Sequence, residues 1–114
     1  MTNQVRNIDA DIQKYKDDIS LRDALVRLEK NRDFKKVFET AYFKDFAQNL
    51  VAQRALPEMR SREELIAANT RKLDAISEAQ HFIRAVHAMG GQADGKLSNA
   101  EVERDVILAE QDEE

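Results

Sequence analysis

Cysteine and tryptophan are missing from this chain of 114 residues, and only one proline and three glycines occur in it. The absence of cysteine excludes a disulfide framework and a thiolate metal site, and it is typical of proteins kept in a reducing compartment. Proline and glycine are the residues that most often interrupt regular structure. Because they are so few, their positions at residue 57 and within 90–95 are the main guides to where helices end.

Long apolar runs are missing as well. The longest uncharged stretch, residues 85–93, is far shorter than the roughly 20 apolar residues that a membrane-spanning helix needs. The first residues also lack the basic and then apolar order of a secretion signal. We therefore expect a protein that stays in the cytoplasm in which it is made and has no membrane partner.

Charge is plentiful but unevenly distributed. The net charge is −4, yet residues 21–57 carry eight Lys or Arg against five acidic residues, whereas residues 92–114 carry two against eight. A hydrophobic content of 42% is too high for a wholly disordered chain. At this length one modest core is expected, so we predict a single helical domain over residues 1–114 that ends in an acidic tail.

Residues 1–19 have the hydrophobic spacing of an amphipathic N-terminal arm. Their apolar positions step by three and four residues, which places them on one stripe of a helix. These positions are Val5, Ile8, Ile12, Tyr15 and Ile19. They also fit two heptads of a coiled coil, fewer than the three or four that identify one. Two interpretations stay open: an arm that packs on its own domain, and an arm whose five side chains dock on a neighbouring protein.

Residues 20–91 are predicted to form the helical core. Ser20 with Asp23 has the spacing of a capping box, so we expect a new helix to begin there after the arm. Asn31 or Asp33 can cap the helix that follows, which carries most of the aromatic residues. That region is expected to end just before the single proline, because the residue before proline is pushed out of the helical conformation.

The longest predicted helix covers residues 62–89. A second capping box, Ser61 with Glu64, opens it, and its apolar stripe is broad enough to face a core. Gly90 is expected to end this helix as a left-handed cap. Residues 92–114 are then predicted to form a loop, a short helix and the acidic tail.

Residues 90–101 give the best match to a metal-binding motif. Aligned with the calcium loop of an EF-hand, they place Asp94 fifth, a glycine sixth and Glu101 twelfth. The first and third places hold Gly90 and Gln92, which supply no carboxylate. With two ligands lost we predict no metal site, and we interpret this range as a glycine-rich turn followed by a helix that a third capping box opens.

Other chemical motifs lack their partner residues. Glu78 with His81 has the Glu-x-x-His spacing of di-iron bundles, but Arg84 stands three residues before His87, so no second pair occurs. There is no nucleophile elbow and no phosphate-binding glycine loop in the sequence. We therefore predict that the protein is not an enzyme and has no catalytic, cofactor-binding or metal residue.

Aromatic residues are few, but five of the seven lie within residues 34–46. Such a cluster marks a core or a docking surface, because aromatic side chains bury the largest area per residue. At about 100° per residue, an α-helix would divide the apolar side chains into two opposed sets. One set is Phe34, Val37, Phe38 and Tyr42, and the other is Phe43, Phe46 and Leu50.

One straight α-helix with these two sets would be apolar on opposite faces. We therefore expect a break or sharp bend within residues 40–43, where β-branched Thr40 and the aromatic residues are weak helix formers. The residues predicted to contact a partner are Tyr42, Phe43, Phe46 and Leu50. Interleaved lysines would suit nucleic acid, but Glu39 and Asp45 lie among them, so no direct contact with nucleic acid is expected.

Residues 20–38 read Ser-Leu-Arg-Asp-Ala-Leu-Val-Arg-Leu-Glu-Lys-Asn-Arg-Asp-Phe-Lys-Lys-Val-Phe. With Tyr42-Phe43 and residues 73–77, this segment resembles small helical proteins encoded among the structural genes of tailed bacteriophages. The resemblance covers residues 20–90, and those relatives often have Gly-Tyr-Phe where this chain has Ala41-Tyr42-Phe43. It implies an accessory protein of the virion or of head assembly, present in copies set by the symmetry of its neighbours.

Together these features predict an all-α protein, a small bundle of about five helices with terminal helical arms. The predicted function is that of a non-enzymatic structural protein, present in many copies and docked on other phage protein subunits, without a cofactor. Its predicted location is the host cytoplasm during synthesis and then the virion. An alternative is a small acidic regulator that uses residues 101–114 to bind and inhibit a host or phage nucleic-acid enzyme.

Overall fold

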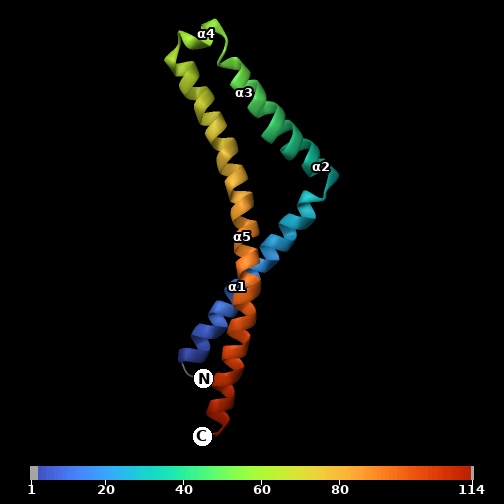
Figure 1. Cartoon of the computed structure of the whole chain (residues 1–114), viewed down its shortest axis with the longest axis vertical. Coiled ribbons are helices and arrows are strands. Elements are labelled where there is room, and N and C mark those ends of the chain that lie inside the picture. Colours follow the sequence, from blue (N-terminus) through green and yellow to red (C-terminus); the bar gives the residue numbers. More distant parts are fainter. Residues whose placement is uncertain (1–2, 114) are drawn as a thin grey trace. The chain divides into compact units, whose positions relative to one another are not determined.

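The computed structural model describes residues 3–113, most of which are helical (Figure 1). The elements are α1 (Asn3–Glu29), α2 (Arg32–Phe34), η1 (Lys35–Phe46), α3 (Ala47–Gln53), α4 (Pro57–Arg60) and α5 (Glu63–Glu113). No strand occurs in this part of the chain, so the all-α prediction is confirmed. The chain divides into two compact units, one made of Met1–Val26 with Ala85–Glu114 and the other of Arg27–Arg84. Across the described residues, no helix combines the length and apolar content that crossing a bilayer requires.

In the first unit, α1 packs antiparallel against the C-terminal part of α5. Near the start of α1, Val5, Ile8 and Ile12 are buried in one cluster with Ile107. The interpretation in which the arm packs on its own chain is therefore correct for these residues. Toward the end of α1, the Arg22 side chain lies against α5, so the two helices stay in contact along this unit.

The predicted restart at Ser20 is wrong, because α1 is continuous from Asn3 to Glu29. The face of the arm that packs on α5 continues beyond residue 19 at the same spacing of three and four, through Arg22 and Val26, which are both half-buried. Ser20 is exposed within the helix. Packing against α5 therefore runs past the expected boundary and leaves no reason for the helix to end there.

The predicted end of the long helix at Gly90 is also wrong, because α5 continues to Glu113 and no glycine has a positive φ. Residues 92–113, which were predicted to form a loop, a short helix and a tail, are part of this same helix. Its stripe toward α1 runs at heptad spacing through positions 86, 90, 93, 97 and 100, which are buried or half-buried. Glycine costs a helix only about 1 kcal/mol, and burial of this stripe outweighs that cost.

In the second unit, the chain between α1 and α5 begins and ends as its capping residues predict. The Asn31 side-chain oxygen accepts hydrogen bonds from the backbone N–H groups of Asp33 and Phe34, at 2.9 and 3.0 Å. Leu56 has an extended conformation before Pro57, the first residue of α4. The helical segment between these points is continuous from Arg32 to Gln53.

The expected break within residues 40–43 is absent. Instead, Lys35–Phe46 form a π-helix, in which the backbone hydrogen bonds span five residues rather than four. This wider turn reduces the rotation per residue from about 100° to roughly 82°. The conflict between two apolar faces is therefore resolved by the pitch of the helix and not by a bend.

Candidate interaction site

Five aromatic rings form one continuous group along η1, which we call the ring array: Phe34, Phe38, Tyr42, Phe43 and Phe46. The rings of Phe34 and Phe38 are stacked with their centroids 5.2 Å apart. Phe38 also contacts Tyr42 and Phe43, at 6.4 and 6.5 Å. Tyr42 in turn lies 5.5 Å from Phe43 and 6.1 Å from Phe46. No ring of the array stands alone.

The π-helix explains why Phe43 lies on the same side as Phe38. In an α-helix, Phe38 and Phe43 would point about 140° apart, whereas the wider turn leaves about 50° between them. The prediction of two opposed aromatic sets is therefore wrong. Each ring contact in such an array is worth roughly 0.5–1.5 kcal/mol beyond area burial, which offsets the poorer hydrogen-bond geometry of the wide turn.

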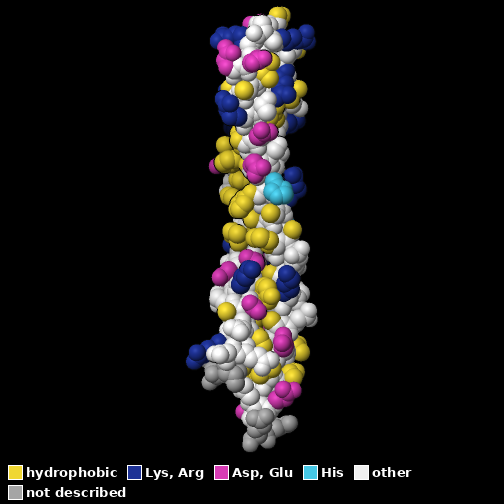
Figure 2. All heavy atoms as spheres, turned by 90° about the vertical axis from the view of Figure 1, so that its left-hand side faces the viewer, with side chains coloured by type: hydrophobic (Ala, Val, Ile, Leu, Met, Phe, Trp, Pro, Cys, Tyr) yellow, Lys and Arg dark blue, Asp and Glu magenta, His cyan; other side chains and the backbone are white. Residues whose placement is uncertain are grey.

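The ring array is only partly covered by the chain. No residue of η1 is buried, and the side chains of Phe38 and Phe46 are 45% and 40% exposed. Phe34 and Phe43 are half-buried and share a small hollow with Ile83 of α5, so one side of the array faces the chain's own helix. Exposed apolar side chains occur elsewhere too, and Figure 2 shows hydrophobic side chains reaching the surface at mid-height on one face of the molecule.

A shallow apolar hollow opens on the uncovered side of η1. Its lining consists of Val37, Ala41, Tyr42 and Phe46, and its surface contains no polar atoms. Val37 is 53% exposed, and Ala41 is the smallest of the four side chains. Such an open apolar surface on a helix is suited to contact with another apolar helix face.

The other predicted contact residues are less available than the sequence suggested. The chain itself covers four of them, which are Leu50, Val5, Ile8 and Ile12. Tyr15 and Ile19 are half-buried along α1. Leu50 is 2% exposed, and its carbonyl oxygen accepts a hydrogen bond from Asn69 of α5. Of the predicted contact residues, only Phe46 is exposed, and Tyr42 and Phe43 are half-buried.

A buried asparagine fixes α3, and with it the C-terminal end of η1. The Asn69 side-chain amide donates a hydrogen bond of 2.8 Å to the Leu50 carbonyl. This carbonyl lies in the last turn of α3, where the Arg54 N–H instead bonds to the Val51 carbonyl, so it needs another donor. Arg54 Nε donates to Asn69 Oδ1 at 2.7 Å, which satisfies both ends of the buried amide.

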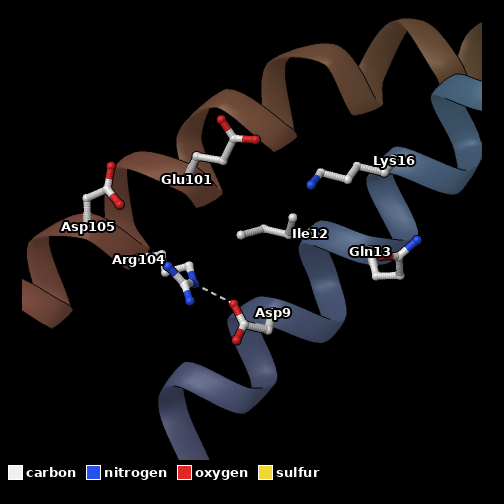
Figure 3. Close-up of a pocket in the computed structure, with 7 residues that line it drawn as sticks. All are labelled: Asp9, Ile12, Gln13, Lys16, Glu101, Arg104 and Asp105. Atoms are coloured by element: carbon white, nitrogen blue, oxygen red, sulfur yellow. Dashed lines mark hydrogen bonds and ion pairs between the residues drawn. The ribbon is translucent and has the colours of Figure 1, made fainter. Parts of the chain in front are cut away.

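The first unit has a different kind of surface, a polar hollow between α1 and α5 (Figure 3). Ile12 lies among charged side chains there, and Arg104 donates a hydrogen bond to Asp9 across the two helices. Lys16 and Glu101 extend toward the hollow from opposite helices. Charges of both signs are present, so the hollow has no strong preference for an anion or a cation.

Farther along the same two helices, Arg22 forms a bidentate pair with Asp94. Its Nη1 and Nη2 donate to the two carboxylate oxygens at 2.8 and 3.3 Å, and its Nε donates to Asp23 at 3.0 Å. The hydrogen bond from Arg22 lowers the pKa of Asp94, and the bonds to Asp94 and Asp23 raise the pKa of Arg22. Asp94 is thus part of the contact between helices.

The range that resembles a calcium loop is helical from residue 90 to residue 101. Its two potential ligands serve other roles, since Asp94 binds Arg22 and Glu101 lines the polar hollow. Within residues 3–113, no three His, Cys, Asp or Glu side chains lie close enough together to hold a metal ion. The interpretation of this range as a glycine-rich turn is wrong, because burial of the α5 stripe against α1 outweighs the cost of glycine in the helix.

Three comparisons with known proteins gave no match: no protein-family model, no curated protein and no solved structure is similar to this chain at a significant level. Sequence reasoning missed the exposure of Phe38, the role of Asn69 and the helix contact at Gly90. Only the contact at Gly90 had a signal, because this residue continues the heptad spacing between Val86 and Ala93.

Proposed function

We propose that this chain is a non-enzymatic structural protein that acts by contact with other protein subunits. The observation that carries the proposal is the exposure of the ring array on η1, a segment without a buried residue. Aromatic side chains are enriched at protein interfaces, where a few of them supply most of the binding energy. Departures from α-helical geometry toward the π-helix also occur frequently at functional sites.

Exposed apolar side chains on the rest of the surface support an assembly in which each chain is present in many copies and contacts several neighbours. Exposed large apolar side chains occur in both units, at Leu21, Leu28, Val37, Phe38, Phe46, Val51, Leu56, Phe82, Met89, Val102 and Val106. A chain that works alone would leave these side chains in water, whereas neighbouring subunits in an assembly can cover them. The buried core of the chain is small by comparison.

The kind of assembly is proposed from the resemblance of residues 20–90 to proteins encoded with tailed-phage structural genes. On this basis the chain is an accessory protein of a phage virion or of its head assembly. It would be made in the host cytoplasm and then join the particle, in a copy number set by the symmetry of its neighbours.

The acidic-regulator alternative is not adopted. A mimic of a nucleic-acid backbone concentrates negative charge on one face so that it fits a basic surface. In the C-terminal part of α5, Glu101 and Asp105 lie on nearly the opposite side of the helix from Glu103 and Glu110, at about 100° per residue. Arg104 also stands between these residues and binds Asp9.

Particle composition tests the proposed function. The phage that carries this gene is grown with the wild-type chain or with Phe38→Ser combined with Phe46→Ser, and purified particles are analysed by quantitative mass spectrometry. We expect a fixed stoichiometry for the wild type and at least a fivefold loss for the double variant. Val51→Ser is the matched control, because Val51 is 58% exposed but lies outside the ring array. Wild-type particles that lack the chain would contradict the proposal.

A further inference from the structure

The apolar hollow of η1 has charged residues of opposite sign along one edge. Lys36 and Asp45 are nine residues apart, which is about two turns of a π-helix, so they lie on the same side of η1. Ala41, which lines the hollow, lies about one turn from each of them. Within residues 3–113, neither charged side chain has an ion-pair partner. The edge therefore carries a positive end and a negative end, both free to bind another molecule.

This arrangement is complementary to itself. Consider two antiparallel copies of the helix related by a two-fold axis perpendicular to both. A residue that precedes the axis in the sequence then lies opposite the partner's residue that follows the axis by the same number of positions, on the same edge of the interface. With the axis close to Ala41, Lys36 lies opposite the partner's Asp45, and Asp45 lies opposite the partner's Lys36. The same register places Phe38 level with the partner's Phe43. Both hollows then face each other, with the small Ala41 side chain at the closest approach.

We propose that a second copy of this chain covers the hollow, packed antiparallel on η1 about this two-fold axis. The inference rests on the proposed function, because it identifies one of the subunits that the chain contacts. The ring array supplies apolar area to the interface, and the two Lys36–Asp45 pairs at its rim fix the orientation and register. A parallel pair about a two-fold axis would instead place the two charged edges on opposite sides of the interface, so no Lys36–Asp45 pair would form. Exposed apolar residues of α5, such as Val102 and Val106, remain available for other subunits.

Charge reversal tests this arrangement. Lys36→Glu and Asp45→Lys are made separately in the full chain, and association is measured by sedimentation velocity and native mass spectrometry over a range of concentrations. In a dimer of either variant, both rim pairs become repulsive, so we expect the dissociation constant to rise roughly five- to fiftyfold. An equimolar mixture of the two variants restores both attractive pairs in the heterodimer. The mixture should therefore dimerise about as tightly as the wild type.

Lys44→Glu is the matched control, because it makes the same charge change about 80° around η1 from Asp45, away from the rim. We expect it to leave the dissociation constant within about twofold of the wild type. Circular dichroism shows whether each variant keeps its helical content, and recovery of the heterodimer on mixing shows directly that both charge variants are folded. Loss of the variant effects at high salt is a further expected result.

Several outcomes would overturn the self-pairing. They are a wild-type chain that is monomeric at all concentrations, single variants that dimerise as tightly as Lys44→Glu, and a mixture that stays monomeric. The proposed function fails separately. A monomeric chain that is retained in purified particles overturns the antiparallel pair only, whereas a dimeric chain that is absent from particles overturns the virion role only.

Discussion

The rings of Phe38 and Phe43, five residues apart in the sequence, contact each other with their centroids 6.5 Å apart. An α-helix cannot place residues at this spacing on one side, because they point about 140° apart. The contact therefore depends on the π-helical pitch of Lys35–Phe46, and the pitch in turn is stabilised by the rings that it gathers. This mutual dependence is the basis of the array.

Truncation of a central ring should cost more stability than truncation of an end ring. Phe43→Ala removes contacts with both Phe38 and Tyr42, and we expect it to lower the free energy of unfolding by about 2 kcal/mol. Phe46→Ala removes a contact with Tyr42 alone and should cost about 1 kcal/mol. Urea denaturation at a low, fixed protein concentration measures both values. Equal costs for the two variants would argue against a connected array.

The change in stability when a glycine of α5 is replaced by alanine should depend on which atoms the added Cβ meets. A Cβ at Gly90 would lie 2.3 Å from the Arg22 Cβ and 2.6 Å from its Cγ, whereas nothing lies within 4 Å of a Cβ at Gly91 or Gly95. We expect Gly90→Ala to destabilise the chain by about 1–3 kcal/mol, because α1 must move away. Gly91→Ala and Gly95→Ala should each stabilise it by about 0.5–1 kcal/mol through helix propensity.

Thermal unfolding of these three variants gives the comparison directly. The two open positions serve as controls for the buried one, since all three make the same chemical change within one helix. A stabilising effect of Gly90→Ala would show that α1 and α5 do not approach closely at this point.

Loss of the buried amide should destabilise the second unit. Asn69→Ala leaves the Leu50 carbonyl without its donor and Arg54 without one acceptor, and we expect a cost of about 1–3 kcal/mol. Thr70→Ala is the control, because it removes only an exposed hydrogen bond from Arg54 and should cost under about 1 kcal/mol. Chemical denaturation measures both. A cost for Asn69→Ala no greater than that of the control would refute the role given to this amide.

The pair between Arg22 and Asp94 should make stability depend on acid pH. Its hydrogen bond lowers the pKa of Asp94 in the folded chain, below the value of about 3.9 in the unfolded chain. The unfolded chain therefore binds the proton more readily, and the contribution of the pair is present above about pH 4 and lost as the pH falls through the folded pKa. Asp94→Asn should remove this part of the pH dependence. Denaturation curves of both proteins between neutral and acidic pH measure the difference, and parallel curves would contradict it.

Much of the fold follows from local patterns in the sequence. The stripe from Val5 to Ile19 correctly predicts an amphipathic helix, and Asn31 and Pro57 correctly mark ends of helical segments. The helix boundaries predicted at Ser20 and Gly90 were wrong. At both positions, burial between α1 and α5 outweighs the local preference of a capping box or a glycine to end a helix. Such burial depends on residues some 70 positions apart, so no local window contains it.

The role of the aromatic cluster as a contact surface stays a prediction, and the assignment of its side chains to helix faces was wrong. The cluster includes two exposed aromatic residues, Phe38 and Phe46. The division of the cluster into opposed sets assumed the rotation per residue of an α-helix, because π-helices are rare. The π-helical pitch of Lys35–Phe46 brings Phe38 and Phe43 together, and the spacing of residues in the sequence does not reveal that pitch.

The most direct test of the account is the contact between Phe38 and Phe43 in solution. Ring-selective isotope labels are placed in the chain, and a small labelled fraction is mixed with excess unlabelled chain so that any nuclear Overhauser effect arises within one molecule. The π-helix predicts a clear effect between the two rings, together with effects from Tyr42 to both. An α-helical segment would leave Phe38 and Phe43 on opposite sides, and absence of the effect between them in the folded chain would contradict the ring array.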